Sequence, residues 1–536
     1  MQRFFSFSTG ILLSLLLVAC GGGGGSDNNL TSSPTPNNNS SEPPPAPTWT
    51  FNVYPPSDQF INFCADPRSG GDPYNNYQPY PDKAGTAMHE KMWLRSFTNE
   101  TYLWYDEVED NDPKQFDSVT AYFEQLKTNE QTPNGADKDQ FHFYESYESF
   151  QKQAQSGVST GYGIGWAVIS TTPPRNFTVA FVEPNSPAAN AGIVRGDKIT
   201  AIDGVDFIAS PDTDTLNAGL SPSESEPHAF VFESVAGEQK EVTLTSMDIE
   251  TTPVRRAQVL ESNNRKVGYV QYNQFIPTAQ QGLIDAFSLF RQQQIDDLVL
   301  DMRYNGGGRV IMAAQLGFMV AGNQSLERVF TTNTLNDKRQ AEERSTEFES
   351  RVIDWPNNAF TEQLLPSVSL PRVYILTTRG TASASENVIN GLRGIDVEVV
   401  LIGDATRGKP YGFVPAQNCG TVYYTIQFAS ENAKGFGDYA DGFMPSGASS
   451  SGEIGLTANV PGCQVSDDFS QPLGSQQEAL FAAALQHIET GTCPAQAQFA
   501  PAANTQRLNQ QGGAVTVPQH PARDGAIWMF PEERNQ

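Results

Sequence analysis

The chain has 536 residues, of which 38% are hydrophobic and 10% aromatic, so it has enough apolar material for a packed core and for about three domains. Its 61 acidic and 34 basic side chains give a formal net charge of −27. Nucleic-acid binding depends on Lys and Arg side chains that neutralise phosphates. This charge therefore excludes a nucleic-acid role and indicates a well-solvated acidic surface.

Residues 1–20 have the pattern of an export signal. Arg3 supplies positive charge, and residues 11–18 form an apolar stretch that is too short for a bilayer span, which needs about 20 residues. The stretch ends in the run LVAC at 17–20, which resembles a bacterial lipobox. That resemblance implies a signal peptide, a lipid anchor on Cys20, and attachment to the bacterial cell envelope, on the periplasmic side of the outer membrane in a Gram-negative cell. The alternative is an ordinary signal peptide that happens to contain a cysteine.

Apart from Cys20, the chain has four cysteines: Cys64, Cys419, Cys463 and Cys493. In an exported protein the surroundings permit their oxidation. Two disulfides are expected, and the sequence leaves all three pairings open. No two cysteines have the CxxC spacing of a redox or zinc site, so we predict no metal site.

Next in the chain, residues 21–50 are mostly Gly, Ser, Asn, Thr and Pro, a composition that predicts a disordered tether. Residues 51–156 bring aromatics back at helical spacing. The segments 92–105 and 116–126 predict two helices of a small N-terminal helical domain, in which the aromatics form a core.

Residues 157–250 alternate short strand-like runs with turns and resemble a PDZ domain. The resemblance rests on the glycine run GYGIGW at 161–166 and on the segments 182–193 and 195–204. In that family, a glycine loop presents backbone N–H groups to a peptide carboxylate, and the peptide adds as a strand to the sheet edge. The residues that match the substrate-binding loop are Tyr162, Gly163, Ile164 and Gly165. The alternative is a PDZ fold that only packs or gates.

Residues 251–495 predict a layered α/β domain, because strand-like runs alternate with helical patterns. The candidate strands are Val267–Tyr272, Asp297–Asp301, Arg372–Thr377, Val397–Gly403 and Val422–Phe428. The helical patterns lie at about 278–294, 309–320, 383–393 and 476–490. Residues 496–536 are rich in Gln, Ala, Pro and Asn and predict a loosely ordered tail, in which Trp528, Met529 and Phe530 are able to dock.

Ser383 lies in the segment 379–387, which follows the strand-like run 373–376 and opens a helical pattern. The N–H groups and dipole of a helix N-terminus favour the negative charge that develops in acyl transfer, so this position suits a nucleophile. Taken alone, the fragment fits an ordinary N-cap better, with Ser383 or Ser385 followed by Glu386 in the first turn.

Lys409 lies 26 positions after Ser383, behind a strand-like run and next to a glycine. A lysine acts as a base near neutral pH only when burial lowers its pKa from about 10.4 to roughly 7–8. The end of a buried strand can provide that burial. The alternatives are a surface lysine and a phosphate-binding lysine. A Walker-type loop has Ser or Thr after the lysine, whereas Pro410 follows here.

A third strand-like run ends in three glycines, at 306–308. Glycines let backbone N–H groups approach a substrate closely, which suits an oxyanion hole. A glycine triplet by itself is more often a loop than a site.

Together these fragments resemble the tail-specific, or carboxyl-terminal processing, serine peptidases. The order is a PDZ domain, D-x-R-x-N-x-G-G at 301–308, S-A-S-E at 383–386 and G-D-x-T-x-G-K at 403–409. The resemblance covers roughly 90–490 and implies an α/β fold of the crotonase and Clp-protease superfamily. It also implies a serine endopeptidase without a cofactor that acts on unfolded polypeptides or their C-terminal ends. The roles it implies are Ser383 as nucleophile, Lys409 as general base, and the N–H groups of Gly307 and Ala384 as the oxyanion hole.

Three departures indicate a divergent branch. The family usually has Gln four residues after the lysine, where this chain has Phe413. Gln417 follows further on, so the third catalytic residue stays open. The spacing from serine to lysine is one residue longer than expected, with an insertion expected near 394–396, and Gly306 replaces a proline.

Other reaction classes have less support. Of five histidines only His487 lies in the α/β domain, on the last predicted helix, where we expect packing or a surface role. No HExxH pair of a metalloprotease occurs. Two non-enzymatic functions are the alternatives. One is a non-catalytic lipoprotein that binds a ligand or peptide on the same fold, as retinoid-carrying relatives do. The other is a scaffold whose PDZ domain binds the tails of partner proteins.

Overall fold

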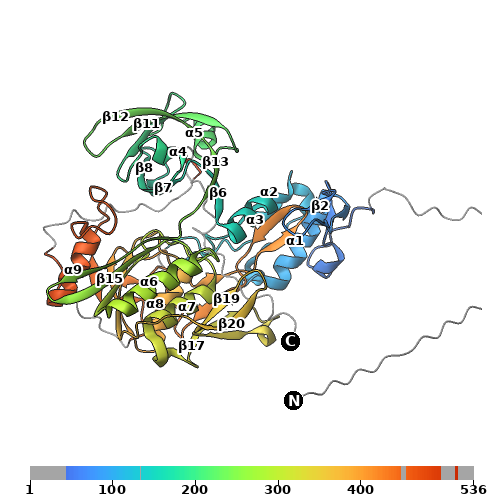
Figure 1. Ribbon diagram of the computed structural model, residues 1–536. Helices are drawn as coiled ribbons and strands as arrows, with labels where there is room; N and C mark the ends of the chain where they lie inside the picture. Colours follow the sequence, from blue (N-terminus) through green and yellow to red (C-terminus); the bar gives the residue numbers. More distant parts are fainter. Residues whose placement is uncertain (1–43, 133–134, 448–453, 496–513, 517–536) are drawn as a thin grey trace, which may run out of the picture. The chain divides into compact units, whose positions relative to one another are not determined.

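The structure is a computed structural model that describes residues 44–132, 135–447, 454–495 and 514–516 (Figure 1). Cys20 and the residues Trp528, Met529 and Phe530 lie outside the described residues. Among the described residues, no helix has both the length and the apolar character needed to cross a bilayer.

The N-terminal region mixes helices with short strands, which the expected helical domain did not include. Its helices are α1 (Ala87–Thr101), α2 (Val119–Phe123) and α3 (Tyr147–Ser156). Its strands are β1 (Phe63–Cys64), β2 (Gly71–Asp72), β3 (Gln78–Pro79), β4 (Lys83–Ala84) and β5 (Phe143–Ser146). The first predicted helix is shifted towards the C-terminus relative to α1, and the second is longer than α2. Helix α1 ends at Thr101, and α2 begins only after Ser118, whose hydroxyl accepts a hydrogen bond from the N–H of Ala121 and caps α2.

The middle region is a twisted sheet with two short helices, α4 (Pro187–Asn190) and α5 (Thr213–Leu220). The main strands are β7 (Ile164–Ser170), β8 (Asn176–Val182), β9 (Lys198–Ile202), β10 (Val205–Asp206), β11 (Pro227–Glu233) and β12 (Gln239–Thr245). They run in the order β12-β11-β9-β8-β7, so β7 forms one edge of this sheet. A separate antiparallel pair, β6 (Val158–Gly161) with β13 (Met247–Glu250), carries the chain into and out of the region.

The α/β region is built on a six-stranded sheet. Its strands, in spatial order, are β14 (Val254–Ser262), β15 (Arg265–Tyr272), β16 (Asp297–Asp301), β21 (Arg372–Thr377), β22 (Glu398–Gly403) and β29 (Gly462–Gln464). Only β14 is antiparallel to its neighbour. Its helices are α6 (Ala279–Gln293), α7 (Val310–Ala321), α8 (Ala384–Gly394) and α9 (Ala479–Thr490). The four predicted helices and four of the five predicted strands are confirmed within a few residues.

Alternate residues of the parallel strands point to opposite faces, and both faces are buried. Leu300 and Ile375 pack in one core with residues of α6, α7 and α8. Val299 and Tyr374 pack in a second core with residues of α9. Burial on both faces explains why these strands appear in the sequence as continuous apolar runs.

The predicted strand Val422–Phe428 is wrong, because the chain changes sheets within it. β25 (Thr421–Tyr424) pairs with β5 of the N-terminal region and with β24 (Ala416–Asn418), whereas β26 (Phe428–Glu431) pairs with β17 (Val329–Leu335). The remaining strands are β18 (Arg344–Glu347), β19 (Arg351–Asp354), β20 (Ala359–Leu364), β23 (Tyr411–Gly412), β27 (Met444–Pro445) and β28 (Asn459–Val460).

Two disulfides join Cys64 to Cys419 and Cys463 to Cys493. This selects one of the three pairings that the sequence left open. The first bond ties the N-terminal region to the turn between β24 and β25, and the second ties β29 to the residues after α9. Both bonds therefore cross-link elements that are distant in sequence.

Candidate active site

Ser383 lies at the turn between β21 and α8, as the sequence predicts. Its backbone has φ +57° and ψ −114°, a conformation that residues other than glycine rarely adopt. The residue is fully buried. Such strain persists only where the surroundings over-determine it, and it is typical of functional turns.

The glycine turn after β16 lies directly against Ser383. A Cβ atom added at Gly307 would come within 2.9 Å of Ala382 O, Ala384 N and Ser383 Cβ, so no other side chain fits there. Asn305 reinforces this contact, because its carbonyl oxygen accepts hydrogen bonds from Ala382 N at 3.0 Å and from the Ser385 hydroxyl at 2.9 Å. The two turns meet because β16 and β21 are parallel neighbours whose carboxyl ends share one edge of the sheet.

The N–H of Gly307, an expected oxyanion donor, is engaged within the turn. It donates to Asn305 Oδ1 at 2.9 Å, and Asn305 Nδ2 in turn donates to Tyr272 O at 3.0 Å. A role for Gly307 in an oxyanion hole thus requires a substrate oxygen to replace Asn305 Oδ1. Ala384, the other expected donor, is the buried first residue of α8, where N–H groups have no partner within the helix.

Glu386 connects the serine turn to the lysine loop. Its Oε2 accepts hydrogen bonds from Ser383 N at 2.8 Å and Lys409 N at 2.9 Å. Its Oε1 accepts from Gly408 N at 2.7 Å and from the Thr406 hydroxyl at 2.5 Å. Burial raises the pKa of the Glu386 carboxyl above its ordinary range, although these four hydrogen bonds oppose the shift.

From the sequence, Glu386 is expected only to be an acidic residue in the first turn of the helix. Its spacing from Ser383 is indeed that of a capping box, and its bond to Ser383 N is the carboxylate half of that motif. Nothing local to residues 383–386 indicates the three bonds to residues 406–409, because they depend on β21 and β22 being neighbours.

Lys409 is fully buried, and two aromatic rings face its amine. Nζ lies 4.7 Å from the ring centre of Phe141 and 4.2 Å from that of Phe413. Phe413 occupies the position where the resemblance implies glutamine, and Phe141 comes from the N-terminal region just before β5. The N-terminal region thus forms part of the lysine's surroundings, which the sequence did not predict.

A buried ionic cluster fixes the end of β16. Arg303 pairs with both oxygens of Glu478, at 2.7 and 2.8 Å, and its Nε donates to Asp301 Oδ1 at 2.9 Å. Asp467 joins this cluster, at 2.8 Å from Arg303 Nη1, and also binds Arg195 Nη2 of the PDZ-like region at 2.6 Å. The cluster therefore links that region to the strand end that leads into the glycine turn.

The four residues of the predicted peptide loop lie before and at the start of β7. Tyr162 does not face a groove but is 6% exposed, with its ring packed edge-on against Phe230 at 5.0 Å. A Cβ at Gly163 would come within 2.3 Å of Ser186 Cβ, and one at Gly165 within 2.4 Å of the Phe181 ring. Both glycines are thus required by packing, and a peptide-binding role for these glycines and for Ile164 stays a prediction.

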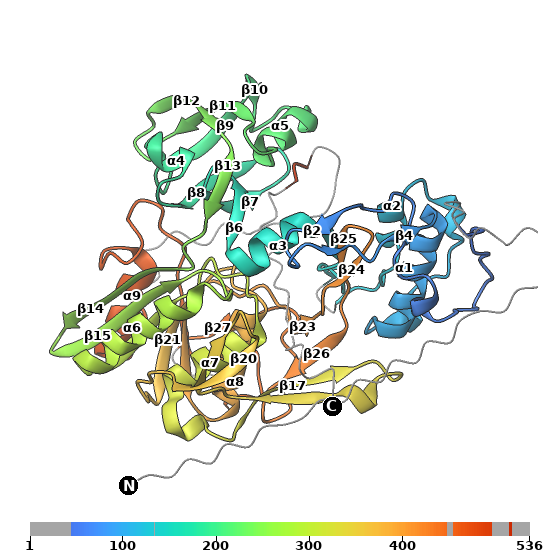
Figure 2. The ribbon, with the colours of Figure 1, turned by 45° about the vertical axis from the view of Figure 1, so that its right-hand side comes forward.

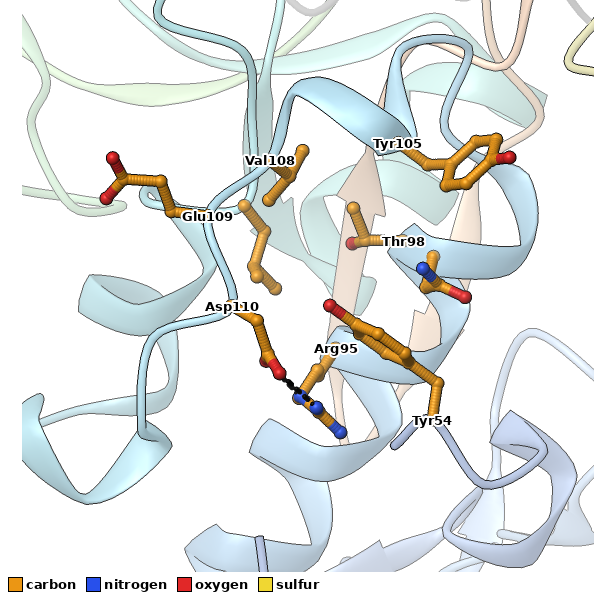
Figure 3. A pocket seen from close by; sticks show the side chains of 9 residues that line it. Tyr54, Arg95, Thr98, Tyr105, Val108, Glu109 and Asp110 are labelled. Atoms are coloured by element: carbon orange, nitrogen blue, oxygen red, sulfur yellow. Dashed lines mark hydrogen bonds and ion pairs between the residues drawn. The ribbon is translucent and has the colours of Figure 1, made fainter. Parts of the chain in front are cut away.

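A pocket in the N-terminal region lies apart from these residues (Figure 3). Two of its charged lining groups pair with each other, since Arg95 Nε donates to Asp110 Oδ1 at 2.5 Å. Arg95 also donates to Val53 O and Thr50 O. We interpret this pocket as the anchor of the segment before α1.

Within the described residues, no group of three or more His, Cys, Asp or Glu side chains is placed to hold a metal ion. His487 is 8% exposed on α9, and its ring packs against that of Tyr374, which confirms the expected packing role.

Comparisons with known proteins agree with this geometry. The chain matches the models of peptidase family S41 over residues 266–427, of the PDZ domain over 178–219 and of the peptidase S41 N-terminal domain over 89–147. Residues 266–427 are thus similar to the peptidase domain of family S41, and residues 89–147 to that family's N-terminal domain. The expected fold class, an α/β peptidase domain with a PDZ domain and an N-terminal domain, is confirmed.

Its curated relatives are carboxyl-terminal processing enzymes. One is the carboxyl-terminal-processing protease of Picosynechococcus sp., 28% identical over 280 residues that cover 49% of this chain and 58% of the relative. Another is the chloroplastic carboxyl-terminal-processing peptidase 2 of Arabidopsis thaliana, 26% identical over 275 residues that cover 50% of this chain and 48% of the relative. The chain thus spans about half the length of the curated relatives it matches.

A solved structure shares the fold. The crystal structure of a candidate S41 protease of Bacteroides fragilis superposes with a TM-score of 0.54 at 24% identity, covering 77% of this chain and 98% of that one. It therefore contains counterparts of most elements described above.

Proposed function

We propose that this chain is a serine endopeptidase that hydrolyses polypeptides, with Ser383 as nucleophile and Lys409 as general base. The observation that carries the proposal is the shared carboxylate oxygen of Glu386, which accepts the N–H groups of both residues at 2.8 and 2.9 Å. Two residues 26 positions apart are thereby held in one buried site beside a glycine turn.

In the first step, Ser383 Oγ attacks the peptide carbonyl carbon while its proton passes to the Lys409 amine. The oxyanion that forms is stabilised by the N–H groups of Ala384 and Gly307, the latter exchanging Asn305 Oδ1 for the substrate oxygen. The C–N bond then breaks, and the leaving amine takes the proton from Lys409. A water molecule, deprotonated by the Lys409 amine, then attacks the acyl carbon. The ester C–O bond breaks, and Ser383 Oγ takes the proton from Lys409, which restores both side chains.

This mechanism requires an uncharged amine, and two opposing effects act on it. The rings of Phe141 and Phe413 attract an ammonium. Complete burial disfavours the ammonium, because the charged form loses its hydration. The complete burial of Lys409 supports its role as a base near neutral pH.

The PDZ domain is proposed to recruit an unstructured polypeptide end through Tyr162–Gly165, or to gate access to Ser383. We further propose export, a lipid anchor at Cys20 and a position at the bacterial cell envelope. The two disulfides support an oxidising compartment outside the cytosol.

The test measures cleavage of reduced, carboxymethylated lactalbumin by the purified chain. Ser383→Ala and Lys409→Ala should each lower cleavage at least 1,000-fold while far-UV circular dichroism stays unchanged. The matched controls are Ser470→Ala and Lys83→Ala, since both residues are exposed and the Lys83 amine also lies over an aromatic ring, 5.1 Å from that of Phe63. Cleavage that survives in Lys409→Ala would overturn the proposed base.

A further inference from the structure

The PDZ sheet has an edge that is suited to accept an extended chain. β7 lies at the end of the strand order, and all its residues are partly exposed. Edge strands carry unpaired backbone N–H and C=O groups that readily bind another extended segment. In peptide recognition by strand addition, such an edge supplies the backbone bonds, and neighbouring pockets accept side chains.

A segment from near the C-terminus lies at this edge (Figure 2). We call residues 514–516, Ala514-Val515-Thr516, the tail segment. The N–H of Val515 donates to the carbonyl of Thr171, the residue that follows β7, at 3.1 Å. The N–H of Thr516 donates to the side-chain oxygen of Asn217 on α5 at 2.7 Å. The tail segment thus bonds to both β7's end and α5.

The side chain of Val515 is part of the PDZ core. It is 4% exposed and belongs to the same buried cluster as Leu216 and Leu220 of α5. Partly buried side chains of β7, including Trp166 and Val168, pack against this cluster. An apolar residue of the tail segment therefore packs against side chains of the edge strand and the helix, and the N–H groups of Val515 and Thr516 are hydrogen-bonded to Thr171 and Asn217.

The occupant is an internal segment rather than a chain end. Twenty residues follow Thr516 in the sequence, and Asn217, its partner, lies 299 positions earlier. Its bond to Thr171 lies at the opposite end of β7 from the glycine loop at 162–165. A peptide that ended at that loop and ran along β7 would reach Thr171 after about seven residues, since a strand advances about 3.3 Å per residue.

We propose that the tail segment is a built-in ligand of the PDZ groove, and that an external polypeptide must displace it to bind along β7. The ligand class is an extended, uncharged peptide with a β-branched aliphatic side chain between small or polar neighbours. The proposal that the tail segment competes with substrate rests on the proposed peptidase function. The proposal that the tail segment occupies the groove does not depend on that function.

A weak contact suffices for this arrangement, because the ligand is covalently attached. About 20 residues connect Cys493 to Ala514, and a chain of that length gives an effective concentration on the order of 1 mM. If the free segment binds with a Kd of about 0.1 mM, the groove is about 90% occupied. An external peptide then binds about tenfold more weakly than to an empty groove.

The binding test uses the full chain with Ser383→Ala, so that a probe is not cleaved, and a fluorescein-labelled peptide of residues 510–520. Fluorescence anisotropy should show about tenfold tighter binding when Val515→Asp is added to the chain, because a buried carboxylate releases the tail segment. The matched control is Val235→Asp, which introduces the same charge at a PDZ residue that is 62% exposed and should leave the affinity unchanged.

A labelled peptide that itself carries the Val515→Asp change should bind at least tenfold more weakly than the unaltered peptide. Equal binding of the two peptides, no binding of either, or no effect of Val515→Asp in the chain would each overturn the proposal. Because the readout is probe binding and not cleavage, these outcomes do not depend on the catalytic roles assigned to Ser383 and Lys409.

A second measurement concerns competition with substrate. With Ser383 intact, the Val515→Asp chain should cleave reduced, carboxymethylated lactalbumin several-fold faster than the unaltered chain at low substrate concentration, and Val235→Asp should not. Tighter probe binding without faster cleavage would overturn the competition and leave the built-in ligand in place.

Discussion

The site around Ser383 (the centre) and the PDZ groove differ in the number of buried interactions that fix their parts in place. At the centre, one buried carboxylate, Glu386, accepts four hydrogen bonds of 2.5–2.9 Å from two loops. In the groove, two backbone hydrogen bonds and one buried side chain hold the tail segment. Breaking a network of several buried hydrogen bonds costs much free energy. A short strand contact costs less to break, so one bound segment readily replaces another. The centre is therefore built as a fixed site, and the groove as an exchangeable one.

The largest expected effect comes from Glu386→Gln, which tests whether the centre depends on its carboxylate. A glutamine amide presents an N–H₂ group to backbone N–H groups and leaves buried donors unpaired, at about 1–3 kcal/mol each. We expect kcat/KM for lactalbumin cleavage to fall about 100-fold or more. Glu398→Gln, an exposed carboxylate at the start of β22, is the control and should stay near the parent value. Near-normal activity of Glu386→Gln would show that the loops are held by other contacts.

The next expected effect is on the stability of the N-terminal segment that packs against Lys409, which contains Phe141 and His142. Burial lowers the pKa of His142, the neighbour of Phe141, to about 4 from an ordinary value of 6.5. Since the folded-state pKa is the lower one, this neutral imidazole stabilises the fold above pH 6.5. That contribution is lost as the pH falls from 6.5 to about 4, and it amounts to about 3 kcal/mol.

Urea unfolding of the parent chain and of His142→Gln at pH 7, 5.5 and 4 measures this contribution. Subtracting the two series cancels every other titrating group, so the difference in unfolding free energy should change by about 3 kcal/mol in favour of the variant at low pH. A difference that stays constant with pH would contradict the role of His142. The tail segment is held by amide groups and a valine side chain, which do not titrate in this range. Its release should therefore not follow the pH dependence expected for His142.

The smallest expected effect is on the pH profile of catalysis, through the ring of Phe413. Phe413→Leu keeps the site apolar but removes one ring face that attracts the ammonium form of Lys409. The amine of Lys409 should then stay uncharged at lower pH, so the acid limb of the pH profile of kcat/KM should move to lower pH. Phe348→Leu, a buried phenylalanine packed against α7, is the control and should leave the limb in place. An unmoved or upward-shifted limb in Phe413→Leu would contradict this prediction.

Local sequence patterns predicted the framework of the α/β region well. Strands buried on both faces are continuous runs of apolar residues, and the helices between them have clear periodicity, so β15, β16, β21 and β22 were located correctly. The same signal failed at Val422–Phe428, because an unbroken apolar run does not reveal that the chain leaves one sheet for another at residues 425–427.

The features that the sequence did not predict all depend on contacts between distant residues. Phe141 reaches Lys409 across more than 260 positions, and the Cys64–Cys419 bond spans 355. Val515 has no local pattern that distinguishes it from the rest of a polar tail. Glu386 was visible as a helix-capping residue, but its bonds to the lysine loop arise only once parallel strands are side by side.

The central claim is that Ser383 is a nucleophile activated by Lys409, and reaction of the full chain with a fluorophosphonate probe tests it without knowledge of the substrate. Mass spectrometry of the digested product should find the adduct on the peptide that contains Ser383. Labelling should disappear in Ser383→Ala and slow at least 100-fold in Lys409→Ala at pH 7.5. An adduct on a different residue, or labelling at the parent rate without the lysine, would contradict the account.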